Sequence, residues 1–150
     1  MSVAVFPGSF DPPTIGHVSI VQRALPLFER VIVALGTNTS KKTLFTAEQR
    51  LGWLTATFGE LPKVQVTTFE GLTVELCKRE NATFILRGLR NGIDHDYERA
   101  IALMNRAMTG VETVFLPAEP AHAHISSTIV RELLANKADV SAFVPPAVRP

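Results

Sequence analysis

Cysteine, net charge and long apolar runs are all scarce in this sequence. The single Cys77 can form no internal disulfide and has no second cysteine with which to share a metal site. With 15 basic and 14 acidic residues, the formal net charge of +1 gives no overall attraction to nucleic acid or an anionic membrane. No apolar run approaches the roughly 18 residues that a membrane-spanning helix needs, and the N-terminus lacks a signal-like segment. We therefore expect a cytoplasmic protein that binds neither nucleic acid nor membranes.

Two common nucleotide-binding fingerprints are also missing. The absence of Gly-x-x-x-x-Gly-Lys-Ser/Thr excludes a Walker-type ATPase, and no Gly-x-Gly-x-x-Gly run is present. The chain contains no internal repeat, low-complexity tract or Gly/Ser linker that would divide it. With 46% hydrophobic content, residues 1–150 are expected to form one domain whose core needs no disulfide. Cys77, in an apolar-patterned segment, is expected to pack in that core.

Short β-branched runs alternate with segments of helical spacing. The runs predict strands at Val3–Phe6, Val31–Leu35, Val64–Phe69, Phe84–Leu86 and Thr113–Leu116. The spacing predicts helices at Ile15–Leu25, Thr46–Phe58, Thr73–Arg79, Asp96–Met108 and Ser127–Ala135, the second one opening on a capping box. Helical crossovers between successive strands favour an α/β fold with a doubly wound, five-stranded parallel sheet covered on both faces. The proline-rich tail from Val144 to Pro150 is expected to lie on the surface.

Ligands of open parallel sheets bind beyond the carboxyl ends of the strands, so the segments after the strands carry the functional prediction. Four of them hold unusual residues: Pro7–His17, Gly36–Lys42, Arg87–Arg90 and Ala123–Thr128. The first has small residues before a helix start, which suits phosphate binding, and it ends in a histidine aimed at the same place. The others supply paired lysines, two guanidinium groups flanking a Gly-Leu turn, and three hydroxyls at a helix start.

Each of these segments alone has an ordinary structural explanation. A histidine near a helix start is often a surface or capping residue, paired lysines are usually solvated, and a Ser-Ser-Thr cluster caps a helix. Their convergence on one edge of one sheet predicts instead a cationic, hydroxyl-rich cleft that binds a polyphosphate. A structural domain with an incidental basic cleft is the alternative, and it leaves the coincidence of four loops unexplained.

The segments carry recognisable signatures. Gly8-Ser9-Phe10-Asp11-Pro12, followed by Thr14-Ile15-Gly16-His17, resembles the first signature of the nucleotidyltransferase superfamily, and Ile125-Ser126-Ser127-Thr128 resembles its second. The match narrows to the bacterial phosphopantetheine adenylyltransferases through Ser40-Lys41-Lys42, Arg87-Gly88-Leu89-Arg90, Asp94–Glu98 and Met104-Asn105-Arg106. The resemblance extends from Val3 to about Pro145. It implies a Rossmann-like nucleotidyltransferase fold and transfer of AMP from ATP to 4′-phosphopantetheine, which yields dephospho-coenzyme A and pyrophosphate.

The resemblance also implies residue roles. As catalytic residues, His17 would stabilise the α-phosphate in the transition state, Lys41 would orient the nucleophilic phosphate, and Arg90 would hold the departing phosphates. The expected phosphopantetheine-binding residues are Ser9, Lys41, Thr73 and Arg87. The expected ATP-binding residues are Ser9, Phe10, His17, Gly88, Leu89, Arg90, Glu98, His122, Ala123, His124, Ile125, Ser126, Ser127 and Thr128. Mg²⁺ is expected to arrive with ATP rather than in a protein metal site. A homohexamer and feedback inhibition by coenzyme A are further expectations.

The sequence departs from the family in the residues before the second signature. The family usually has an aromatic-Ser-aromatic run where this chain has His122-Ala123-His124, so the adenine pocket is expected to differ. The two histidines also leave open the possibility of a metal site, although no third ligand is evident.

Two alternative functions remain open: that of a related transferase, a nicotinamide mononucleotide adenylyltransferase or cytidylyltransferase, and that of a non-catalytic nucleotide- or coenzyme-A-binding module. The presence of His17, Lys41 and Arg90 disfavours the second.

Overall fold

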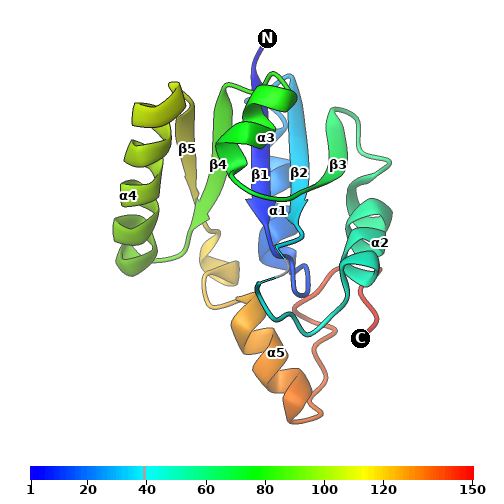
Figure 1. The fold of residues 1–150 in the computed structure, drawn as a ribbon. Helices are drawn as coiled ribbons and strands as arrows, with labels where there is room; N and C mark the ends of the chain where they lie inside the picture. Colours follow the sequence, from blue (N-terminus) through cyan, green and yellow to red (C-terminus); the bar gives the residue numbers. More distant parts are fainter. Residues whose placement is uncertain (39) are drawn as a thin grey trace.

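A five-stranded parallel sheet, in the order β3-β2-β1-β4-β5, forms the centre of the computed structural model (Figure 1). The structure describes residues 1–38 and 40–150, so Thr39 of the polar Gly36–Lys42 loop lies outside the described residues. The strands are β1 Val3–Gly8, β2 Arg30–Gly36, β3 Val64–Phe69, β4 Phe84–Leu89 and β5 Glu112–Pro117. The helices are α1 Ile15–Ala24, α2 Ala47–Phe58, α3 Thr73–Arg79, α4 Gly92–Thr109 and α5 Ser127–Ala135, with a 3-10 turn, η1, at Pro120–His122. The predicted α/β fold is confirmed.

Successive residues of a strand point to opposite faces of the sheet, and a hydrophobic core lies on each face. Phe6 and Val33 belong to the core that α1 and α2 cover, whereas Val5 and Ile32 belong to the core that α3 covers. Figure 1 shows α3 in front of the sheet and α1 behind it. Cys77 is fully buried in the second core, which confirms its predicted packing, and burial raises the pKa of its thiol to about 11. Within residues 1–38 and 40–150, no helix is long and apolar enough to cross a membrane.

Side-chain caps fix the starts of α2, where a cap was predicted, and of α4, where none was predicted. The Thr46 hydroxyl accepts from the Gln49 N–H over 3.1 Å, and the Gln49 side chain accepts from the Thr46 N–H over 3.0 Å, which confirms the capping box. Helix α4 begins at Gly92 rather than at the predicted Asp96. Its cap is Asn91, whose side chain accepts from the backbone N–H of Asp94 over 2.9 Å.

The C-terminal tail is not a surface segment, contrary to the prediction. Val144 and Val148 are each only 5% exposed, and they join Val130 of α5 and Val140 in a third core. Trp53 of α2 packs against the same core. Proline prevents a helix here but leaves valine side chains free to pack. The tail therefore ties α5 to α2, and Figure 1 shows it returning from α5 toward α2.

Candidate active site

Two adjoining cavities open at the carboxyl ends of the strands, the edge beyond which α5 lies (Figure 1). The α4 cavity has a volume of about 360 Å³ and is lined by residues of α4 together with Phe69 and Thr73. The α5 cavity, of about 320 Å³, is lined by residues of the β1–α1 segment and of α5. The two share a wall formed by Pro7, Gly8, Ser9, Lys41, Arg87 and Glu98.

Most of the residues predicted from sequence line these cavities. All four predicted phosphopantetheine-binding residues line the α4 cavity. Of the predicted ATP-binding residues, all line the α5 cavity except Leu89, Ala123 and His124. The carbonyl of Leu89 accepts from the Ala118 N–H over 2.7 Å, and the His124 ring lies 6.5 Å from that of Phe143. The structure thus gathers residues from each of the four predicted segments at one sheet edge.

The Arg87–Arg90 segment differs from the predicted turn. Arg87, Gly88 and Leu89 are the last residues of β4, and only Arg90 follows the strand. A Cβ at Gly88 would lie 3.1 Å from the Ile20 side chain of α1, so the glycine permits a close approach of helix and strand. The two guanidinium groups therefore project from a strand and from its end, not from two sides of a loop.

His17 sits in the first turn of α1 as a neutral hydrogen-bond donor. The backbone N–H of Thr14 donates to His17 Nδ1 over 2.9 Å, which leaves the ring proton on Nε2. Burial, followed by the positive charges of Arg87 and Arg90, lowers the pKa of His17 to about 4. Near pH 7 the imidazole is therefore uncharged and can offer its Nε2–H to a ligand in the α5 cavity.

Phe10 supports the His17 ring. Its own ring is 2% exposed, stacks with Phe6 at 5.7 Å and meets His17 edge-on at 4.9 Å. The backbone of Phe10 has φ 44°, in the left-handed region that costs a bulky residue free energy. A Cβ at Gly8 would lie 3.0 Å from the Phe10 ring, so a side chain there would displace it. The β1–α1 segment is thus built to hold one imidazole in place.

Lys41 lies at the boundary between the cavities. Its Nζ donates to Ser9 Oγ over 3.0 Å, and both residues belong to the shared wall. Lys42, the other lysine of the pair, lines neither cavity. The structure therefore separates the two lysines in the way that the resemblance predicted, with Lys41 at the cavities and Lys42 outside them.

Two carboxylates hold the predicted arginines. Arg87 Nε and Nη2 donate to Glu98 over 3.0 and 2.6 Å, and Arg87 Nη1 donates to the Pro7 carbonyl over 2.7 Å. Arg90 Nε donates to Asp94 Oδ2 over 3.1 Å. Glu98 was predicted to contact the nucleotide, and here its carboxylate binds Arg87. A guanidinium group has five N–H donors, so each arginine still has donors for a ligand.

The hydroxyls of the second signature have structural partners. Ser126 caps α5 by accepting from the Ile129 N–H over 3.2 Å, as its position predicts. Ser127 Oγ donates to the Pro12 carbonyl over 2.8 Å, which joins the start of α5 to the β1–α1 segment. Thr128 lines the α5 cavity at the same helix start, where the helix dipole favours an anion.

Arg131 is a cavity residue that the sequence reasoning missed. It lies one helical turn after Ser127 and lines the α5 cavity. Its Nη1 donates to the Asp11 carbonyl over 2.8 Å, and its Nη2 donates to Thr128 Oγ1 over 3.2 Å. The spacing of four residues from Ser127 on one helix would have identified it as a further cation facing the same place.

The two histidines that raised a metal hypothesis do not belong to a metal cluster. Among residues 1–38 and 40–150, no group of three or more His, Cys, Asp or Glu side chains could hold a metal ion. His122 lines the α5 cavity, and its buried Nδ1 has no hydrogen-bond partner in the described part of the chain.

Comparison with known proteins places the chain in a family. Residues 5–133 match the cytidylyltransferase-like family. Over 149 residues, the chain is 50% identical to the phosphopantetheine adenylyltransferase of Christiangramia forsetii and 48% identical to that of Flavobacterium psychrophilum, covering 99% of each chain.

A solved structure supports the fold alone. It is a putative nicotinate-nucleotide adenylyltransferase from Vibrio parahaemolyticus, 20% identical, which matches with a TM-score of 0.70 over 97% of this chain and 88% of that one. The narrower family assignment depends on the sequence identity to the two phosphopantetheine adenylyltransferases, which extends over their full length. This chain therefore belongs to the cytidylyltransferase-like family and, within it, to the phosphopantetheine adenylyltransferases.

Proposed function

We propose that this protein transfers the adenylyl group of ATP to 4′-phosphopantetheine at the two adjoining cavities, giving dephospho-coenzyme A and pyrophosphate. The reaction is that of the family to which the chain belongs, and it is a late step of coenzyme A biosynthesis. The observation that carries the assignment is the wall shared by the cavities, where Lys41 meets Ser9. ATP occupies the α5 cavity and the pantetheine arm the α4 cavity, so that the two phosphates meet at this wall.

The chemistry requires positioning and charge stabilisation rather than a covalent enzyme intermediate. An oxygen of the acceptor phosphate bonds to the α-phosphorus while the bond from that phosphorus to pyrophosphate breaks. Lys41 holds the acceptor phosphate, and the Nε2–H of His17 stabilises charge on the α-phosphate. Arg90 and the start of α5 receive the charge that accumulates on pyrophosphate. Because its pKa is about 4, His17 acts as a neutral donor and transfers no proton.

Mg²⁺ belongs to this proposal as a companion of ATP. The acidic side chains of the α5 cavity are already engaged, Asp94 and Glu98 by arginines and Asp11 by backbone N–H groups. With these carboxylates engaged by protein groups, Mg²⁺ would be coordinated mainly by phosphate oxygens and water. When bound, the ion would neutralise charge on the ATP phosphates.

The first test of the function is pyrophosphate release from ATP and magnesium, with 4′-phosphopantetheine in one reaction and nicotinamide mononucleotide in another. Release with phosphopantetheine alone is the expected result. Release with the mononucleotide alone would retain the chemistry and overturn the substrate. No release in either reaction, with ATP binding retained, would favour the non-catalytic nucleotide-binding module.

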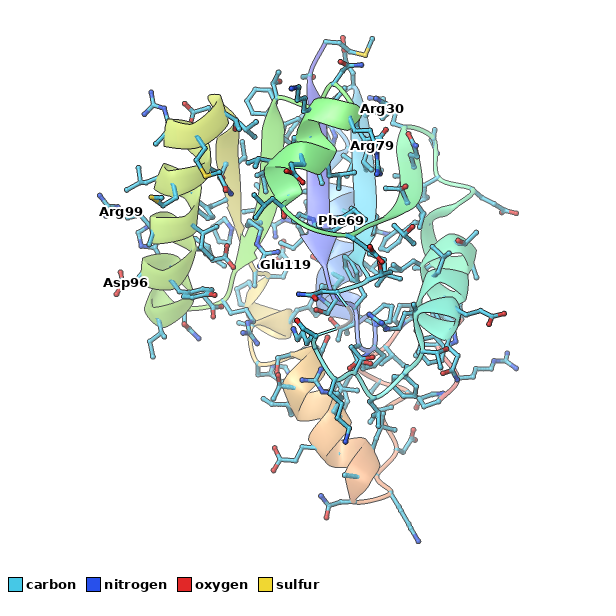
Figure 2. The ribbon with its side chains drawn as sticks, viewed as in Figure 1. Arg30, Phe69, Arg79, Asp96, Arg99 and Glu119 are labelled. Carbon is cyan, nitrogen blue, oxygen red and sulfur yellow. The ribbon has the colours of Figure 1, made fainter. Side chains whose placement is uncertain are left out.

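A homohexamer is part of the same proposal, and helix α4 supports it. No residue of α4 is buried, and Figure 2 shows Asp96 and Arg99 on it directed away from the sheet. An apolar stripe at helical spacing is exposed on the same helix, formed by Ile93, Tyr97, Ile101, Met104 and Met108. A stripe of this kind is typical of a protein–protein interface, and a second copy of the chain is the partner that a homohexamer supplies.

Met104→Glu is expected to dissociate the hexamer, because Met104 is 62% exposed in the stripe and a charge buried in an interface is costly. Sedimentation velocity of wild type and variant measures the change. Arg99→Glu, which alters charge on α4 outside the stripe, should retain the assembly. A hexamer that survives Met104→Glu, or a monomeric wild type, would contradict the proposed interface.

Feedback inhibition by coenzyme A and a cytoplasmic location complete the proposal. Coenzyme A combines a pantetheine arm with an adenine nucleotide, so its two ends match the ligands assigned to the α4 and α5 cavities. Occupation of both cavities would exclude both substrates. Inhibition should accordingly be competitive with both ATP and phosphopantetheine in initial-rate measurements.

A further inference from the structure

Two buried charged side chains connect the loops that carry the predicted catalytic residues. In the part of the chain that the structure describes, Asp11 and Arg50 are the only charged residues that are buried, at 3% and 4% exposure. Asp11 lies in the β1–α1 segment, between Ser9 and His17. Arg50 lies in the first turns of α2, the helix that follows the Lys41 loop. Neither residue was assigned a role in the site, although Asp11 belongs to the first signature and lines the α5 cavity.

The Asp11 carboxylate binds the loop that carries Lys41. Its Oδ2 accepts from the Leu44 N–H over 2.8 Å, and its Oδ1 accepts from the Phe45 N–H over 2.9 Å. Both N–H groups belong to the segment that joins Lys41 to α2. Asp11 therefore fixes the position of this segment relative to the β1–α1 segment.

The Arg50 guanidinium makes the reciprocal connection. Its Nη1 donates to the Ser9 carbonyl over 2.7 Å, and its Nε donates to the carbonyls of Phe45 and Thr46 over 3.1 and 3.3 Å. Within residues 1–38 and 40–150 it forms no ion pair, and its hydrogen-bond partners are backbone carbonyls. A buried charge is an expensive means of stabilising a fold, because apolar side chains fill a core at lower cost.

We propose that Asp11 and Arg50 are positioning residues that together form a clasp, which sets the separation between the ATP-binding segment and Lys41. This inference rests on the proposed function, because it assigns one substrate to each of the two loops. Ser9 Oγ accepts from Lys41, so a shift of the Ser9 backbone also shifts the partner of the lysine. A misplacement of about 1 Å can lower a rate by about 100-fold. The clasp therefore acts on turnover more than on the binding of either substrate.

Trp53 reports on the clasp without any need for catalysis. It is the single tryptophan of the chain, and its ring meets that of Phe45 edge-on at a centroid distance of 4.8 Å. The N–H and the carbonyl of Phe45 are bound by Asp11 and Arg50, respectively. Loosening the clasp should thus expose Trp53, and acrylamide quenching of its fluorescence measures that exposure.

The deciding variant is Arg50→Lys, which keeps the charge and most of the aliphatic stem but cannot reach three carbonyls in a planar fork. We expect kcat to fall at least about tenfold at a temperature where the variant is folded, since reacting groups lose their alignment. The affinity for ATP alone, from equilibrium titration, should change little, and quenching of Trp53 should rise. These shifts separate lost positioning from lost binding.

Arg30→Lys is the matched control. Arg30 begins β2 and donates to the Glu80 carbonyl over 3.1 Å and to Gln65 Oε1 over 2.9 Å. Figure 2 labels it at the end of the sheet opposite to α5. Its replacement should lower the melting temperature while leaving both kcat and the quenching of Trp53 at wild-type values.

Three results would overturn the clasp: wild-type kcat in folded Arg50→Lys, an equal kcat loss in Arg30→Lys, or unchanged Trp53 quenching in Arg50→Lys. Should Arg50→Lys fail to fold, Asp11→Asn, which preserves size and removes the charge, undergoes the same measurements. A wild-type protein that releases no pyrophosphate with phosphopantetheine would refute the proposed function instead. The quenching comparison would then still decide whether Arg50 holds the Phe45 segment.

Discussion

His17→Ala is expected to lower kcat by about 10²- to 10³-fold, or roughly 2.7–4 kcal/mol, the cost of removing one transition-state hydrogen-bond donor. The structure gives His17 a single free donor, because Thr14 occupies Nδ1 and the low pKa keeps the ring neutral. The donor strengthens as charge develops on the α-phosphate, so the affinity for ATP should change much less. Pyrophosphate release at saturating substrates gives kcat, and titration with ATP alone gives the affinity.

A histidine outside the cavities provides the control for this variant. His95, on α4, lines neither cavity, and its ring lies 6.1 Å from that of Phe115. His95→Ala should turn over at the wild-type rate. An equal loss of ATP affinity and turnover in His17→Ala would assign His17 to uniform substrate binding and contradict the transition-state role.

The lowered pKa of His17 also makes the free energy of unfolding depend on pH, and it determines the direction of that dependence. The pKa of a histidine in an unfolded chain is about 6.5, whereas the pKa of folded His17 is about 4. Between these values the unfolded chain takes up a proton that the folded chain refuses, so the free energy of unfolding falls as the pH drops from about 6.5 toward 4. Denaturant titrations across this window should show a smaller loss for His17→Ala than for wild type.

Lys41→Ala should lower kcat/KM for phosphopantetheine by roughly 10- to 100-fold, because a hydrogen bond to a charged group contributes about 1.5–3 kcal/mol. The lysine lies at the shared wall, where the acceptor phosphate is proposed to bind. The binding of ATP alone should be nearly unchanged. Initial rates at varied phosphopantetheine and saturating ATP measure the effect.

Lys42→Ala is the matched control, since Lys42 adjoins Lys41 and lines neither cavity. It should behave as wild type. Unchanged kinetics with phosphopantetheine in Lys41→Ala would remove Lys41 from the site. A loss of equal size in Lys42→Ala would mean that the loop contributes only a diffuse positive charge.

Most of the fold was predictable because apolar runs and capping residues determine the strands and helices in which they themselves lie. The strands of the sheet centre are nearly continuous apolar runs, and the capping box at Thr46 satisfies its own helix end. The predicted end of β4 was wrong: the prediction ended the strand at Leu86 because Arg87 and Gly88 have weak strand propensity, whereas the strand continues to Leu89. Their pairing with Phe115 and Leu116 of β5, which the sequence alone does not reveal, extends the strand.

The candidate site was predictable where its residues follow strands and unpredictable where they act through distant partners. His17 and Lys41 lie in segments that the parallel-sheet rule singles out. Arg50 looks like an ordinary helix residue until its reach to the Ser9 carbonyl is seen. The buried valines of the tail, such as Val148, were missed for the same reason, since their core is formed by α5 and α2.

The burial of Cys77 bears on how the enzyme handles its own substrate. 4′-Phosphopantetheine ends in a free thiol, which forms mixed disulfides with accessible cysteine thiolates when conditions become oxidising. The only cysteine of this chain lies on the buried side of α3, in the core between this helix and the sheet, and its pKa of about 11 keeps it protonated. The protein therefore offers the reactive end of its substrate no sulfur with which to exchange, and the arm can enter and leave without covalent capture.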